Sequence, residues 1–95
     1  MAAVLVTEHI APTATATSAS IAQNTSRRRI TLINSGATAD LYVSERATNA
    51  GTPATTTAHS IKLGLGDSIT LYSTAALFIF TAVGTGDCTY VEETP

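Results

Sequence analysis

The chain has little charge. Of its 95 residues, 13% are Asp, Glu, Lys or Arg, and the formal net charge is −2. Five residues are Lys or Arg, whereas proteins that bind nucleic acid neutralise phosphates with many such side chains. A nucleic-acid partner is therefore disfavoured. A surface this poor in charge must consist mainly of Thr, Ser, Ala and Asn, which suits contacts with neighbouring subunits and equally a mildly polar monomer.

Cysteine and large apolar residues are also scarce. Cys88 is the single cysteine, so no disulfide can form within the chain, and a reducing compartment is the simplest interpretation. Ile, Leu, Val and Phe together supply 21 residues. Burial of so few core side chains offsets little of the conformational entropy lost on folding, which costs about 1.5 kcal/mol per residue. We therefore expect a homo-oligomer, either a dimer or a trimer, or a subunit docked on a larger partner.

The N-terminal segment lacks the features of a secretory signal or a membrane span. Its apolar run is short, Glu8 comes early and no basic residue precedes it, so we expect no membrane partner. Residues 3–9 instead alternate as a β-strand does, with Val4 and Val6 on one face and Leu5 on the other.

Residues 10–24 form a low-complexity stretch of Ala, Thr and Ser without helical periodicity. Two interpretations stay open. The stretch is an extended connection with a short strand near residues 18–22, or an arm that becomes ordered only on a partner. The single domain is thus divided into residues 1–24, an N-terminal strand with an arm or connection, and residues 25–95, the body of a β-sandwich.

Two alternating stretches flank a small polar turn between Arg27 and Glu45, which predicts a β-hairpin. The side chains expected on its core face are Ile30, Leu32, Leu41 and Val43. Residues 47–57, which follow, are polar and too numerous for a tight turn. We expect an exposed loop there.

The same alternation continues to the end of the chain. Residues 59–63 and 68–72 predict a second hairpin across residues 64–67, and the last strand follows residues 84–87. In both turns, glycine is expected to supply a positive φ. Residues 77–83 are apolar without alternation, which indicates a strand covered on both faces. Seven to eight short strands and no helix predict an all-β fold, an antiparallel β-sandwich or a small jelly roll.

No residue pattern indicates catalysis. His9 and His59 are the possible imidazole bases, but no nucleophile motif of a known spacing accompanies them. Two histidines and one cysteine are too few for a closed zinc site. Each glycine turn leads into a strand, whereas a phosphate-binding glycine loop leads into the N-terminus of a helix. We therefore expect no catalytic residues, no metal, no cofactor and no enzymatic activity.

An arginine triplet is the one cluster of charge. Strand alternation places Arg28 on the side of the core and points Arg27 and Arg29 the other way. Arg27 and Arg29 are therefore candidates for binding an acidic partner surface. The alternative is a salt bridge at the rim of the sandwich, with an acid such as Glu8, Asp40 or Glu45.

Two tyrosines are further candidates for a contact surface. Tyr42 and Tyr72 lie on the opposite strand face from their apolar neighbours, which is the outward face in a sandwich of two sheets. An amphipathic ring in that position anchors an interface or stacks on a sugar. We expect both rings to contribute to assembly.

Four segments carry a resemblance to a known class of protein. Ser26-Arg27-Arg28-Arg29-Ile30-Thr31-Leu32-Ile33-Asn34-Ser35-Gly36 is an arginine-led strand that ends in Asn-x-Gly. It is followed by Leu41-Tyr42-Val43, by Ile61-Lys62-Leu63-Gly64-Leu65-Gly66-Asp67-Ser68, and by Val91-Glu92-Glu93. Over residues 20–93 this pattern resembles small virion proteins of tailed bacteriophages.

The resemblance implies a capsid decoration, or cement, subunit. Such a protein is a β-sandwich without enzymatic activity, made in the host cytoplasm and placed on the capsid surface of the virion. Its partner would be the major capsid protein or another virion protein. A component of a phage neck, tail or fibre is the alternative, as is a β-module that binds a glycan or receptor.

Overall fold

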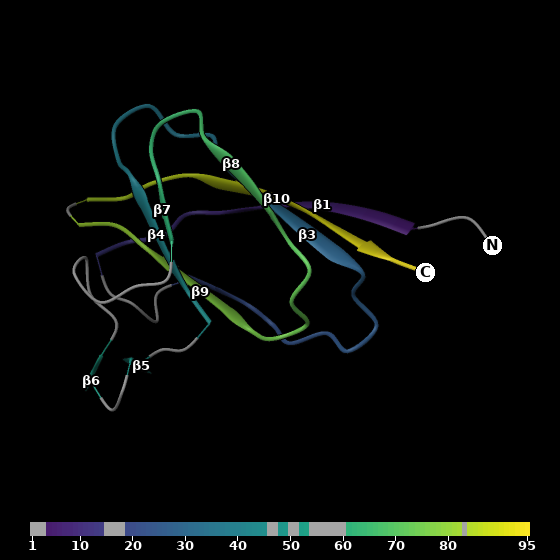
Figure 1. Ribbon diagram of the computed structural model, residues 1–95. Helices are drawn as coiled ribbons and strands as arrows, with labels where there is room; N and C mark the ends of the chain where they lie inside the picture. Colours follow the sequence, from purple (N-terminus) through teal and green to yellow (C-terminus); the bar gives the residue numbers. More distant parts are fainter. Residues whose placement is uncertain (1–3, 15–18, 46–47, 50–51, 54–60, 83) are drawn as a thin grey trace.

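The computed structural model describes residues 4–14, 19–45, 48–49, 52–53, 61–82 and 84–95. These residues form strands and connections (Figure 1). The strands are β1 (Val4–Ile10), β2 (Ala19–Ile21), β3 (Arg29–Asn34), β4 (Leu41–Ser44), β5 (Thr48–Asn49), β6 (Thr52–Pro53), β7 (Ile61–Leu63), β8 (Ser68–Leu71), β9 (Leu77–Phe80) and β10 (Cys88–Thr94). In this part of the chain, no helix is long and apolar enough to span a membrane.

Eight of these strands form two antiparallel sheets of four. Sheet A has the order β1-β10-β3-β8, and sheet B has the order β2-β9-β4-β7. The short β5 and β6 pair with each other. The predicted all-β sandwich is confirmed. Its strand order is that of a jelly roll, because the chain changes sheet at every connection between the eight strands except the one from β4 to β7.

The two predicted hairpins are wrong. β3 belongs to sheet A and β4 to sheet B, and β7 and β8 are separated in the same way. The four residues predicted for the core face are nevertheless all buried, with Ile30 and Leu32 in one sheet and Leu41 and Val43 in the other. Alternation identifies which face of a strand is apolar. It does not say whether two such strands pair within one sheet or face each other across the sandwich.

Side chains from both sheets fill the space between them. The buried cluster consists of Ile21, Ile30, Leu32, Leu41, Val43, Leu63, Leu77, Ile79 and Cys88. Ile69 and Leu71 pack against it as predicted. On β9 the inward Leu77 and Ile79 are buried, and so is Phe80. The strand ends at Phe80 and not at the predicted residue 83.

The N-terminal strands are part of the sandwich. β1 is an edge strand of sheet A, and β2 is an edge strand of sheet B. The short strand predicted near residues 18–22 is therefore confirmed, and residue 24 is no boundary of the sandwich. Most of the predicted loop 47–57, together with His59, lies outside the described residues.

Both glycine turns use a positive φ, as predicted, but at different places. The angle is 79° at Gly66, the second glycine of its turn, and 73° at Gly84, the first of its turn. Gly66 sits in a β-turn in which the Asp67 amide donates to the Gly64 carbonyl at 3.0 Å. Both turns connect strands of opposite sheets.

Candidate interaction surface

Arg27 lies inside the fold and not on a contact surface. Its side chain has 0% of its area exposed, and its Nε lies 2.7 Å from Glu92 Oε2. Nη1 donates to the carbonyls of Ser73 and Ala75, each at 3.0 Å, and Nη2 donates to the Ala22 carbonyl at 2.8 Å. Because this side chain is enclosed by its own chain, the prediction that Arg27 docks on a partner is wrong.

The prediction for Arg27 failed because alternation applies only within a strand. β3 begins at Arg29, so Arg27 belongs to the preceding loop, and the loop turns its side chain inward. The acids that pair with the arginines are Glu92 and Glu93, both on β10 beside β3. They are not the acids suggested by the sequence, namely Glu8, Asp40 and Glu45.

Arg29 and Tyr72 lie at the same end of the outer face of sheet A. Arg29 alternates with the buried Ile30, and Tyr72 directly follows β8, which pairs with β3. In the next strands of the sheet, Glu93 is opposite Arg29 and Leu5 is opposite Glu93. We name this group the end patch, which consists of Leu5, Arg29, Tyr72 and Glu93.

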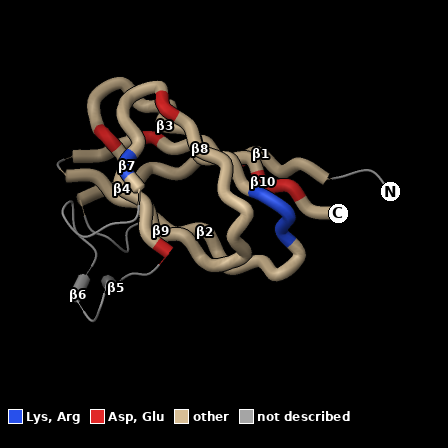
Figure 2. The backbone as a smooth tube through the Cα atoms, viewed as in Figure 1, with Lys and Arg blue, Asp and Glu red and all other residues tan. Residues whose placement is uncertain are grey.

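The end patch combines exposed apolar area with a single ion pair. Tyr72 is 75% exposed and Leu5 is 63% exposed. Arg29 Nη2 lies 2.7 Å from Glu93 Oε1, and Figure 2 shows the basic start of β3 beside the acidic end of β10. Tyrosine and arginine are enriched in protein interfaces. The patch therefore has the composition of a contact site.

Beyond the end patch, this face is mainly polar and carries few charged side chains. Next to the end patch, the register aligns Thr7, Val91, Thr31 and Thr70 in a row across the sheet. The Thr31 and Thr70 hydroxyls are 2.9 Å apart. The next row carries His9 at the edge, whose Nε2 lies 3.0 Å from Asp87 Oδ1. Between the Arg29–Glu93 ion pair and the His9–Asp87 contact, the face has little charge to desolvate when a partner covers it.

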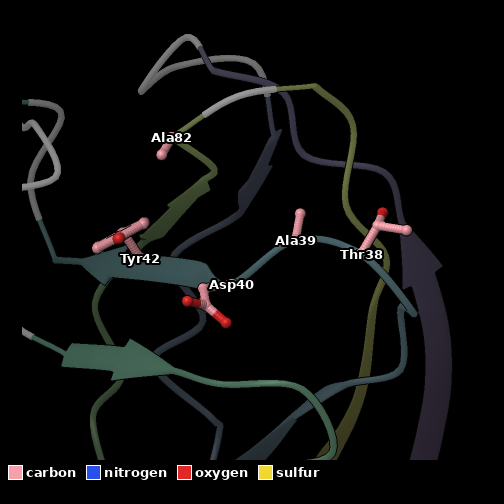
Figure 3. Close-up of a pocket in the computed structure, with 5 residues that line it drawn as sticks. All are labelled: Thr38, Ala39, Asp40, Tyr42 and Ala82. Carbon is pink, nitrogen blue, oxygen red and sulfur yellow. The ribbon is translucent and has the colours of Figure 1, made fainter.

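Tyr42 lies on the opposite side of the molecule, on the outer face of sheet B. Its ring stacks on Phe80, with centroids 5.7 Å apart and an interplanar angle of 22°. Lys62 Nζ is 5.8 Å from the Tyr42 centroid and 3.6 Å from Asp40 Oδ2. Tyr42 borders a pocket of about 200 Å³ (Figure 3), lined by Thr38, Ala39, Asp40, Tyr42 and Ala82. The two tyrosines therefore belong to separate surfaces.

The described residues contain few reactive groups. They include no group of three or more His, Cys, Asp or Glu that could hold a metal ion. Cys88, buried as predicted, has 0% of its area exposed. Burial raises its pKa to about 11, so the thiol is protonated and unreactive at neutral pH.

The pKa shifts of Cys88 and Tyr90 predict a loss of stability in alkali. Burial raises both values, and nearby Glu8 and Glu92 raise that of Tyr90 further. Above pH 9, the unfolded state releases these protons before the folded state does, so the free energy of unfolding falls as the pH rises toward about 11. Urea denaturation between these pH values measures the fall.

The matched variants for this prediction are Cys88→Ala and Tyr90→Phe. Each removes one ionisable group, so the double variant is expected to lose less stability across the same pH range than the wild type. An equal dependence on pH in the double variant and the wild type would assign the effect to other groups.

Sequence reasoning missed the exposure of Leu5. Alternation separated Leu5 from Val4 and Val6 correctly, but all three are exposed. A local pattern gives no information on whether a neighbouring element covers a strand.

Comparisons of the chain with protein-family models, with curated proteins and with solved structures find no match. The geometry of the two surfaces is therefore the basis on which a function can be assigned.

Proposed function

We propose that this protein is a structural virion component of a tailed phage, a capsid decoration subunit that binds the outer shell and stabilises it. The observation that carries the proposal is the end patch on the outer face of sheet A. There Leu5 and Tyr72 are largely exposed, and a row of hydroxyls and Val91 continues the surface.

This surface suits a partner that is itself folded and flat. A sheet face with few charges buries its area without a large desolvation cost, and Tyr72 supplies a rigid ring that loses little conformational entropy on binding. A shell of many identical subunits presents such a partner repeatedly. Binding to the assembled shell and not to its dissociated subunits stabilises the shell by mass action.

The first test is binding to bare capsids. Addition of the protein is expected to raise the resistance of capsids to heat or denaturant, measured by light scattering and by co-sedimentation of the protein with the particles. Absence of binding to mature capsids would overturn the proposal. Electron microscopy of the decorated particle then distinguishes the shell from a neck, tail or fibre location.

Tyr72→Ala is expected to weaken capsid binding by about tenfold, which corresponds to about 1.4 kcal/mol. The ring is 75% exposed in the single subunit, so its removal leaves the fold and its stability nearly unchanged. The matched control is Leu65→Ala, because Leu65 is also exposed, at 51%, but lies in the turn after β7. Equal binding by both variants would exclude the end patch from the shell contact.

A second candidate function is a glycan- or receptor-binding module of a fibre. The observation that favours it is the pocket beside Tyr42, where an aromatic ring lies near the Asp40 carboxylate and the Lys62 ammonium. Sugars stack on such rings and donate hydroxyl hydrogens to carboxylates. Retention on a glycan array that is lost in Asp40→Asn supports this function, and absence of retention by the wild type counts against it.

A further inference from the structure

The first half of β1, Val4–Thr7, is a sheet edge without the usual protection against pairing. Natural sheets protect their edges with very short strands, with charged side chains, with proline or with bulges. β2 and β7 have three residues each, β8 has four, and β7 also carries Lys62. β1 has seven residues and pairs with β10 in an unbroken register, and its one acidic residue, Glu8, lies after the uncharged segment Val4–Thr7.

The first three residues of β1 are also apolar and exposed. Val4 is 52% exposed, Leu5 is 63% exposed and Val6 is 41% exposed. These side chains point to both faces of sheet A, since Leu5 alternates with its neighbours. A neighbour that adds a strand to this edge covers apolar area on both faces and pairs the free backbone groups at the same time.

We propose that β1 pairs antiparallel with β1 of a second copy, about a two-fold axis that passes through Leu5. The segment Val4-Leu5-Val6 reads the same in both directions. In this register Leu5 lies opposite the partner's Leu5, and Val4 lies opposite the partner's Val6. Each exposed apolar side chain therefore packs against an apolar side chain of the other copy. This match follows from the symmetric sequence and is not expected with an unrelated strand.

Two properties favour this register over shifted registers: the face to which each side chain points, and the charge of Glu8. A shift by one residue would place the outward side chains of one copy opposite the inward side chains of the other. Registers shifted by two or four residues place Glu8 opposite Val4 or Val6 of the partner subunit. With the axis at Leu5, the two Glu8 carboxylates lie at opposite ends of the paired segment, far from each other.

The pairing joins two copies of sheet A into one continuous sheet. Leu5 belongs to the end patch, so the two end patches meet at the dimer axis and form a single surface with two-fold symmetry. The inference depends on the free edge and its sequence, and not on the proposed binding to a shell.

Cysteine cross-linking tests the register directly. Residues opposite each other in an antiparallel pair have Cα atoms about 4.5–5.5 Å apart, within the span of about 4.4–6.8 Å that a disulfide bridges. Leu5→Cys is therefore expected to give a covalent dimer under mild oxidation. Two Thr7 residues would lie about 13 Å apart, because four strand steps separate them, so Thr7→Cys is the control for register.

Leu65→Cys is the control for random collision, since Leu65 is exposed but lies between β7 and β8, and β8 is at the opposite edge of sheet A from β1. The native Cys88 is buried and does not interfere. We expect Leu5→Cys to cross-link at least about tenfold faster than either control. An equal rate in Leu5→Cys and Leu65→Cys would overturn the proposal, as would faster cross-linking in Thr7→Cys.

Sedimentation separates this inference from the proposed function. The wild type is expected to dimerise reversibly as its concentration rises to about 100 μM, with a Kd in the micromolar range, and Leu5→Lys is expected to stay monomeric while Leu65→Lys dimerises. A wild type that stays monomeric, combined with loss of capsid binding in Leu5→Lys, assigns the edge to a shell protein and overturns the pairing. A dimer that binds no capsid supports the pairing and overturns only the shell role.

Discussion

Replacement of Arg27 by Met is expected to lower the free energy of unfolding by about 3–5 kcal/mol, the usual cost of breaking a buried ion pair by removing one partner. Met fills most of the volume but donates no hydrogen bond. Glu92, whose side chain is 18% exposed, then lacks its cation. The carbonyls of Ala22, Ser73 and Ala75 lose the donors that Arg27 provides.

The physical reason for so large an effect is that one planar guanidinium connects three parts of the chain. From the end of the β2–β3 connection, Arg27 holds the start of that connection, the β8–β9 connection and β10 together. A lysine ammonium is compact and cannot reach four acceptors at once. Arg27→Lys is therefore expected to recover only part of the loss.

The matched control for Arg27 is Arg29→Met. Arg29 also pairs with a glutamate of β10, but its side chain is 53% exposed, and exposed pairs contribute about 0–1 kcal/mol. Urea denaturation followed by circular dichroism measures all three variants. If Arg27→Met costs no more than Arg29→Met, the buried network is not a main source of stability.

Asn34→Ala is expected to lower the free energy of unfolding by about 2–4 kcal/mol, because it leaves buried groups without hydrogen bonds. Asn34 is 1% exposed at the end of β3. Its Nδ2 donates to the carbonyls of Ala39 at 3.0 Å and Leu63 at 3.1 Å, and its Oδ1 accepts from the Gly36 amide at 3.1 Å. Since Leu63 belongs to sheet B, this side chain connects the two sheets.

Two further variants isolate the contribution of Asn34. Asn34→Asp retains an acceptor for the Gly36 amide but loses both donors and buries a carboxylate, so at neutral pH it is expected to be at least as destabilising as Asn34→Ala. Ser35→Ala removes the exposed contact between Ser35 and Thr89 and is expected to cost about 0.5 kcal/mol or less. Equal stability of the Asn34→Ala and Ser35→Ala variants would contradict the role of Asn34.

Local patterns in the sequence predicted the strands and their apolar faces. Alternation around Ile30, Leu32, Leu41 and Val43 identified four side chains that are all buried. The buried state of Cys88 and a positive φ in each glycine turn were also predictable. Each of these properties is set by a residue and its close neighbours, so one sequence is enough to predict it.

The candidate surfaces were predictable only in part. Alternation placed Arg29 and Tyr72 outward, and both are exposed. It also placed Arg27 outward, where the fold instead encloses the side chain within a network. Tyr42 faces outward as expected but lies on the other sheet from Tyr72, against Phe80. A strand pattern gives the face of each side chain within its own sheet, and it does not say which sheet the strand joins.

Local sequence is therefore sufficient to set the strand content of this protein, the inward face of its strands and the low charge of its surface. Three other properties follow from the three-dimensional fold: β3 and β4 lie in opposite sheets, Arg27 is enclosed, and the apolar start of β1 forms an unprotected edge. The reason is physical. Side-chain alternation is a local property of the chain, whereas pairing, enclosure and exposed edges depend on segments far apart in sequence.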